Sequence, residues 1–110
     1  MILHIFIWYN HFVSVTVVSG KFEWHQEKEQ QNFRNHNCDF QTAIRVFADP
    51  NRVVAHDEKH SIAEPRFFCF GMVDGKILTV RFTQRKDRIR IIGAAYWRKG
   101  RDIYAKKNKK

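Results

Sequence analysis

The segment from Arg66 to Ile92 constrains the fold more than any other part of the sequence. It contains Asp74-Gly75, a two-residue signal for a tight hairpin whose central residues take positive φ, which Gly adopts freely and Asp tolerates. With Val73 opposite Lys76, the register of the flanking strands follows. Side chains alternate across a strand, so one face of this hairpin is apolar. Its members are Phe67, Cys69, Gly71, Leu78, Val80 and Phe82.

The opposite face of the hairpin collects positive charge. If Thr83 lies opposite Arg88 across a loop from Gln84 to Asp87, then Arg81 lies opposite Arg90, and a two-residue loop would keep the same parity. The face then contains Arg66, Arg81, Arg88 and Arg90. Because like charges directly opposite each other destabilise a sheet, we expect an anionic partner, either a phosphate or an acidic protein segment. The alternative is that these arginines are ordinary solvated side chains.

Charge and composition limit the classes of function. The 110 residues are one domain in length and contain 20 Lys and Arg against 11 Asp and Glu, a net charge of +9 that is concentrated after residue 75. This balance favours nucleic acid or an acidic protein as partner. Cys38 and Cys69 fit no metal or redox spacing, so we expect buried thiols in a reducing cytoplasm. His56 and His60 lack the further ligands of a zinc site, so we expect neither metal nor cofactor.

Residues 1–20 are apolar but contain His4, Asn10 and His11 and no Lys or Arg. A signal peptide requires a positive start, and a membrane span requires about 20 cleaner apolar residues. We expect this segment to lie outside a domain that spans residues 21–105. An additional strand over Phe12 to Val18 is one alternative, and a membrane tether is another.

The rest of the chain predicts an α+β fold. We expect a short strand from Lys21 to Trp24, then a helix from Gln26 to Asn35 that ends at a left-handed Asn37. Asp39 is positioned to cap a second helix, whose buried stripe is Phe40, Ala43, Ile44 and Phe47 and which ends at Asp49-Pro50. Further along the chain we expect a strand from Arg52 to His56, a polar connection from Asp57 to Pro65, a basic aromatic helix after residue 95, and a disordered basic tail over residues 106–110.

With this element order, the sequence resembles the BrnT family of type II toxins. The matching residues are Phe22-Glu23-Trp24, Lys28, Asn32, His36, Phe40, Ala43, Val46-Phe47, Asp49-Pro50, Asp57, His60-Ser61, Glu64, Arg66-Phe67, Gly71, Asp74-Gly75, Thr83, Arg85 and Arg88-Ile89-Arg90-Ile91-Ile92. The resemblance implies a RelE-like fold with two N-terminal helices packed on a small antiparallel sheet and a short C-terminal helix. It also implies an endoribonuclease that arrests translation, and a ribbon-helix-helix antitoxin through which the complex binds operator DNA.

The sequence departs from the family pattern in three places. The family's Asp after the Trp is His25, which weakens a helix cap, and its usual Gly after the His is Asn37. Its common Ser-Ala-Arg is Gly93-Ala94-Ala95, so one arginine expected near the active face is replaced at Ala95. Arg81 and Arg98 are the candidates to compensate.

Metal-independent RNA cleavage needs a base for the 2′-hydroxyl, cations for the phosphoryl charge and an acid for the leaving oxygen. Our catalytic candidates are Arg66, Arg85, Arg90, Glu64 and His36, the arginines because a guanidinium matches phosphate bidentately. His36 is equally a candidate for a structural hydrogen bond at a helix end. Our RNA-binding candidates are Arg81, Arg88, Phe68, Tyr96, Trp97, Arg98 and Lys28, with the aromatic rings stacking on unpaired bases.

Two alternatives stay open at this point. Phe68 could instead be covered by the C-terminal segment. The altered Gly93-Ala94-Ala95 segment favours a catalytically silent module that binds nucleic acid or an antitoxin.

Overall fold

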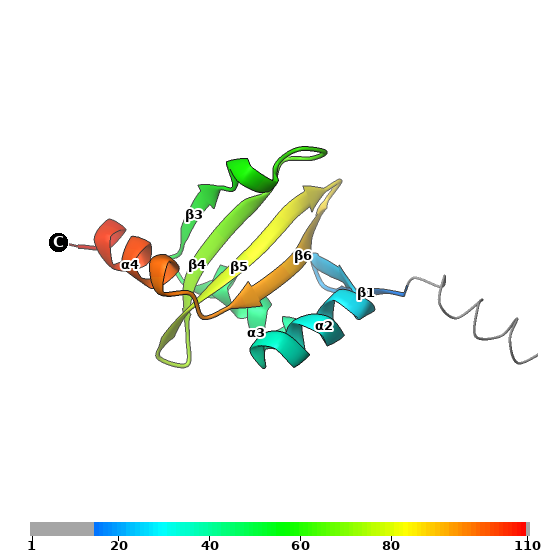
Figure 1. Ribbon diagram of the computed structural model, residues 1–110, viewed down its shortest axis with the longest axis horizontal. Helices are drawn as coiled ribbons and strands as arrows, with labels where there is room; N and C mark the ends of the chain where they lie inside the picture. The colour runs from blue at the N-terminus through cyan, green and yellow to red at the C-terminus, as the bar shows by residue number, and fades with distance from the viewer. Residues whose placement is uncertain (1–14, 110) are drawn as a thin grey trace, which may run out of the picture.

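The hairpin at Asp74-Gly75 lies within a six-stranded sheet (Figure 1). The computed structural model describes residues 15–109. The strands are β1 (Thr16–Ser19), β2 (Phe22–His25), β3 (Val53–His56), β4 (Phe67–Val73), β5 (Lys76–Arg85) and β6 (Arg88–Ala95), in the spatial order β1-β2-β6-β5-β4-β3. The helical segments are α2 (Gln26–His36), α3 (Phe40–Ala43), α4 (Arg98–Lys107) and the 3-10 turns η1 (Ile44–Ala48) and η2 (Glu58–His60).

The predicted arrangement of two N-terminal helices on a small antiparallel sheet is wrong. An antiparallel hairpin, β1 with β2, precedes α2, and β2 then pairs in parallel with β6. This pairing converts the antiparallel ladder into a six-stranded mixed sheet. The expected strand near Trp24 is present as β2, which is only four residues long. Its parallel partner β6 is distant in the sequence, so no local sequence signal predicts their pairing.

The first hairpin has the register predicted from its turn. Val73 pairs with Lys76, the pairing continues to Phe67 with Phe82, and Asp74 and Gly75 have φ of 51° and 81°. The apolar face forms the core with α3 and η1. Gly71 permits this contact, because a Cβ there would lie 2.7 Å from the Cβ of Val46.

The second hairpin differs from its predicted register. Its turn is Lys86-Asp87, so Arg85 pairs with Arg88 and Thr83 with Arg90. A bulge then shifts the pairing so that Arg81 lies opposite Gly93. The predicted Arg81–Arg90 pair is therefore wrong, although the parity, and with it the shared face of these arginines, is kept. Such a bulge inserts one extra residue and leaves no clear signal in the sequence.

The second helix begins as predicted but winds more tightly after one turn. The carboxylate of Asp39 accepts a hydrogen bond of 2.7 Å from the Thr42 N–H, and Asn37, at φ 53°, ends α2. α3 continues as the 3-10 turn η1, in which side chains three residues apart share one face. The fully buried side chains are therefore Phe40, Ala43 and Val46. The predicted stripe was thus only partly right, since Ile44 and Phe47 are only partly buried.

α4 lies on the other face of the sheet, and Gly100 is the residue that permits its close approach. A Cβ at this position would overlap the Thr79 hydroxyl and come within 2.8 Å of the Phe70 ring. Asp49 holds the same helix, because its carboxylate accepts 2.7 Å hydrogen bonds from the Tyr104 hydroxyl and the Met72 N–H. Gly100 and Tyr104 together fix α4 over one end of the sheet.

Both ends of the described chain are tied to the fold. β1 pairs with β2 inside the segment that we expected to precede the domain, while the remainder of the alternative strand from Phe12, residues 12–14, lies outside the described residues. α4 continues to Lys107, two residues into the expected tail. Among residues 15–109 no helix is both long and apolar enough to cross a bilayer.

The two thiols are buried, as predicted, with exposures of 3% for Cys38 and 0% for Cys69. Burial raises the pKa of Cys38 to about 11 and that of Cys69 to about 12. Both side chains therefore belong to the core and stay as thiols at neutral pH.

Candidate functional site

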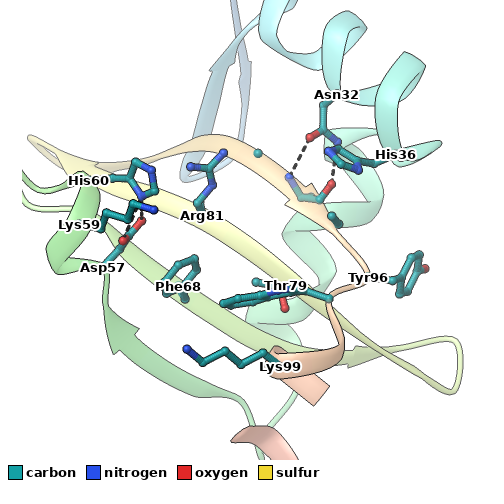
Figure 2. A pocket seen from close by; sticks show the side chains of 14 residues that line it. Asn32, His36, Asp57, Lys59, His60, Phe68, Thr79, Arg81, Tyr96 and Lys99 are labelled. Atoms are coloured by element: carbon teal, nitrogen blue, oxygen red, sulfur yellow. Dashed lines mark hydrogen bonds and ion pairs between the residues drawn. The ribbon is translucent and has the colours of Figure 1, made fainter. Parts of the chain in front are cut away.

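A pocket of about 620 Å³ opens on the sheet face opposite the core (Figure 2). Its floor is made by β4, β5 and β6 through Phe68, Thr79, Arg81, Gly93, Ala94 and Ala95. Its walls come from three places: the end of α2, with Asn32 and His36; the η2 turn, with Asp57, Lys59 and His60; and the start of α4, with Tyr96, Trp97 and Lys99. Segments far apart in the sequence thus converge on one hollow.

Arg81 is the cation at the centre of this pocket. The bulge places it opposite Gly93, and a Cβ on Gly93 would lie 3.4 Å from the Arg81 Nη2 atom, so the guanidinium lies over this glycine. Within residues 15–109 the Arg81 side chain has no carboxylate partner and no hydrogen bond. Since a guanidinium stays protonated, Arg81 presents an uncompensated positive charge to whatever enters.

His60 is fixed beside Arg81 by a buried carboxylate. Its Nδ1 atom lies 2.9 Å and 3.1 Å from the two carboxylate oxygens of Asp57, whose side chain is 4% exposed. Because an ionised carboxylate only accepts hydrogen bonds, Nδ1 carries the proton and donates it. In the neutral ring Nε2 is then the acceptor. Figure 2 shows the His60 ring next to Arg81, with its bonds to Asp57 below it.

The turn that holds this pair is itself attached to β4. The Asp57 N–H donates to the Arg66 carbonyl at 2.8 Å, and the Ser61 hydroxyl donates to the Asp57 carbonyl at 2.6 Å. The Arg66 N–H in turn donates to the Ser61 hydroxyl at 2.8 Å. These bonds attach the turn that carries His60 to Arg66, the residue immediately before β4.

A second histidine, His36, lies across the pocket from His60, on the far side of Arg81 in Figure 2. α2 is held here by Asn32, whose side-chain amide bonds to the buried edge of β6 past the end of its pairing with β2. The Asn32 Nδ2 donates to the Ala94 carbonyl at 2.9 Å, and its Oδ1 accepts from the Ala94 N–H at 3.0 Å. Asn32 therefore substitutes for a neighbouring strand and fixes the helix end that carries His36.

Aromatic rings form the side of the pocket next to α4. Phe68 packs on Trp97 with ring centroids 5.5 Å apart, and the Lys99 Nζ atom lies 5.7 Å from the centroid of the Trp97 ring. Trp97 is 40% exposed and Tyr96 is 51% exposed. The C-terminal segment thus contacts Phe68 without closing the pocket.

A second group of charged residues lies on the same face, at its other end. It consists of three arginines and the two glutamates that pair with them, and we call it the paired cluster: Glu23, Glu64, Arg66, Arg85 and Arg90. The Arg90 Nε atom donates to Glu23 at 2.6 Å, and its Nη1 lies 2.6 Å from the His25 Nε2. Glu64 lies 3.3 Å from Arg85 and 3.7 Å from Arg66. Every arginine of this cluster is therefore compensated by a carboxylate.

The structure separates the predicted site residues into two places. The pocket brings together His36, Phe68, Arg81, Tyr96 and Trp97. The other end of the face has Glu64, Arg85, Arg88 and Arg90 around a hollow of about 470 Å³, with Arg66 attached through Glu64. Arg98 lines a neighbouring hollow, and Lys28 lies on α2 outside both. The sequence alone did not single out Asp57, Lys59, His60 and Lys99 as site residues; the Asp57-x-x-His60 spacing, one helical turn, was the available signal.

This arrangement allows a specific kind of chemistry. Arg81 can bind an anion, and the imidazoles on either side of it can accept and donate protons. Exposed rings at one wall can stack on a planar group. Such a pocket suits an anionic ester with attached aromatic bases.

A family model described as "Ribonuclease toxin, BrnT, of type II toxin-antitoxin system" matches residues 24–100. The match includes every residue that lines the pocket. No curated protein matches the chain.

Proposed function

The chain belongs to the BrnT family of ribonuclease toxins of type II toxin–antitoxin systems, and we propose that the pocket around Arg81 is where it cleaves RNA. Membership of this family implies an antitoxin partner. The observation that carries the proposal is an unpaired guanidinium between two histidines, one of which is oriented by a buried carboxylate.

We propose that the reaction proceeds by internal attack of the RNA on its own phosphate. His60 Nε2 takes the proton of the ribose 2′-hydroxyl, and the 2′ oxygen bonds to the adjacent phosphorus. Arg81 stabilises the negative charge that grows on the phosphoryl oxygens. The bond from phosphorus to the 5′ oxygen breaks as His36 donates a proton to that oxygen. The products are a 2′,3′-cyclic phosphate and a 5′-hydroxyl, and no step requires a metal.

The aromatic wall supports single-stranded RNA as the substrate. Phe68, Tyr96 and Trp97 line the pocket, and proteins hold unpaired bases by stacking them on such rings. In a duplex these base faces are occupied by neighbouring bases. Cleavage of messenger RNA at this site would arrest translation.

We propose a supporting role for the paired cluster. An RNA phosphate would have to displace Glu64 or Glu23 to reach Arg66, Arg85 or Arg90, so these arginines are poorly placed to supply the main stabilising charge. Arg88 is exposed at the β5–β6 turn and free to contact the backbone of a bound strand. The cluster then guides the strand while Arg81 acts on the scissile phosphate.

We also propose that the antitoxin is a ribbon-helix-helix protein and that operator DNA is bound only through the toxin–antitoxin complex. The charge of this chain supports an inhibitor that covers the basic sheet face with an acidic segment, because complementary charges speed association and fix orientation.

The proposal is tested by incubating the purified protein with a single-stranded transcript in excess EDTA and mapping the new RNA ends. We expect cyclic phosphate ends from the wild type and intact RNA from the H36Q/H60Q double variant. The variant should keep the wild-type circular dichroism spectrum, because both histidines lie at the surface and a glutamine amide at position 60 can still donate to the buried Asp57. Intact RNA with the wild type, or equal cleavage by both proteins, would refute the proposal.

The presence of alanine at position 95 supports one alternative function: binding of RNA or of the antitoxin without cleavage of RNA. Ala95 lies opposite Thr79 on the pocket floor, at the position where the family pattern has an arginine. If this alternative holds, the wild-type protein binds the transcript but leaves it uncut in the same experiment.

A further inference from the structure

A second hollow, of about 680 Å³, adjoins the Arg81 pocket at the start of α4. It lies between the β4–β5 turn and the helix and is lined by Gly75, Lys76, Ile77, Tyr96, Trp97, Arg98 and Arg101. Tyr96 and Trp97 line both hollows and so form a ridge between them. Both volumes fall in the range of roughly 300–1,000 Å³ that is usual for small-ligand sites.

The charges around the second hollow are uncompensated. Its lining contains Lys76, Arg98 and Arg101 but no carboxylate. Within the described part of the chain none of these three side chains has an ion pair. This sets the hollow apart from the paired cluster, where carboxylates already occupy the arginines. A polyanion that enters here has no intramolecular carboxylate to displace.

The ridge has the geometry of a stacking platform. Trp97 is supported by Phe68 at 5.5 Å between ring centroids, and the Lys76 Nζ atom lies 5.7 Å from the centroid of the Tyr96 ring. Both rings nevertheless remain 40% to 51% exposed. Large exposed rings flanked by cations are how proteins hold single strands without reading sequence.

We propose that the second hollow is a nucleotide-binding subsite, across which a single RNA strand continues from the Arg81 pocket. Bases stack on Tyr96 and Trp97, and the phosphates of the following nucleotides contact Lys76 and Arg101. This inference rests on the proposed function, since it extends the strand that Arg81 holds. We therefore expect the affinity that the subsite contributes to depend on the length of the RNA strand and not on the identity of its bases.

The test measures binding separately from cleavage. Fluorescein-labelled 2′-O-methyl oligoribonucleotides of two and eight nucleotides lack the attacking hydroxyl and stay intact, so anisotropy reports affinity alone. The variants are K76A/R101A in the subsite, R81A in the first pocket, and K107A at the far end of α4 as a matched control. All are exposed or partly exposed positions, and melting curves confirm that each variant is folded.

We expect K76A/R101A to weaken octamer binding by roughly tenfold and dinucleotide binding by less than about twofold, because only the longer strand reaches the subsite. The slope of log affinity against log salt should fall by about 1.4 in magnitude, about 0.7 for each lost phosphate contact. R81A should weaken both oligonucleotides, and K107A neither.

Wild-type octamer affinity in K76A/R101A, with R81A impaired, would overturn the subsite and leave the proposed function intact. Wild-type affinity in R81A, with K76A/R101A impaired, would instead count against the proposed function and support RNA binding at the second hollow. Loss of antitoxin affinity with unchanged RNA affinity in K76A/R101A would show a protein-docking surface and overturn the subsite.

Discussion

The paired cluster and the Arg81 pocket occupy opposite ends of one sheet face, and they use arginine in different ways. In the cluster Arg90 is held by Glu23, and Arg66 and Arg85 share Glu64. In the pocket Arg81 has no such partner among the described residues and is flanked instead by imidazoles and aromatic rings.

The difference shows how two chemically identical groups acquire separate roles. A carboxylate beside a guanidinium fixes its position and cancels its charge, and an incoming phosphate must compete with that carboxylate. An unpaired guanidinium is less stabilising to the fold, but its charge is available to a ligand. The cluster is therefore suited to joining β2 to β6 and the connection before β4 to β5, and the pocket to chemistry.

The largest effect is expected for His60. H60A should lower kcat/KM for RNA cleavage by about 10²- to 10⁴-fold, the usual contribution of a positioned general base. H56A is the matched control, because the His56 ring packs on Phe67 and does not line the pocket, yet it contacts the same turn through the Ser61 hydroxyl at 3.3 Å. Rates measured on one transcript check this. Equal losses for H56A and H60A would indicate a structural effect, and no loss for H60A would contradict its role.

Stability should respond most at the paired cluster. E23Q removes the carboxylate that compensates Arg90. Both side chains of this pair are nearly buried, with exposures of 12% for Arg90 and 10% for Glu23. We expect a loss of about 2–3 kcal/mol in the free energy of unfolding, somewhat less than for a fully buried pair. Urea unfolding measures it, with the exposed E27Q as control, for which we expect less than about 1 kcal/mol. A stable E23Q would mean that the cluster does not hold the sheet.

A gain is expected when an arginine is added to the pocket floor. A95R places a guanidinium on the pocket floor, on the same face as Arg81, and should raise kcat/KM by on the order of tenfold through a charge-assisted contact to phosphate. A105R makes the same substitution on the exposed part of α4 and should have little effect. Equal gains for both variants would attribute the change to net charge alone.

The smallest effect is a pH dependence of stability caused by His25, which contacts Arg90 of the paired cluster. Burial, followed by the charges of Arg90 and Arg85, lowers the pKa of His25 from 6.5. As pH falls below 6.5, the unfolded chain takes up this proton before the folded one, so stability declines toward the folded-state pKa. H25Q keeps an acceptor for Arg90 but cannot titrate. Urea midpoints at pH 7.5 and 5.5 should therefore differ less in H25Q than in the wild type, and an equal difference would exclude this contribution.

Local signals predicted the local parts of the fold. Asp74-Gly75 determined the first hairpin, and Asn37 and Asp39 marked helix ends, because turn and cap chemistry depend on a few adjacent residues. The parallel pairing of β2 with β6 and the bulge beside Arg81 could not be predicted this way. Both depend on how distant segments pack, and no single residue encodes them.

The candidate site shows the same division. Alternation along the strands placed the arginines on one face, yet it could not show that Glu23 compensates Arg90, a residue 67 positions away. Asp57 was within reach of sequence reasoning, since it lies one turn before His60. Its burial, which gives the pair its fixed geometry, became visible only in the folded chain.

The most direct test of the account compares R81A with R85A in cleavage of one RNA under identical conditions. Both variants remove a guanidinium from the same strand and the same face. We predict that R81A lowers kcat/KM by roughly 10²- to 10³-fold, as loss of a main charge-stabilising donor does, and R85A by less than about tenfold. A larger loss in R85A than in R81A would contradict the account and move the reaction to the paired cluster.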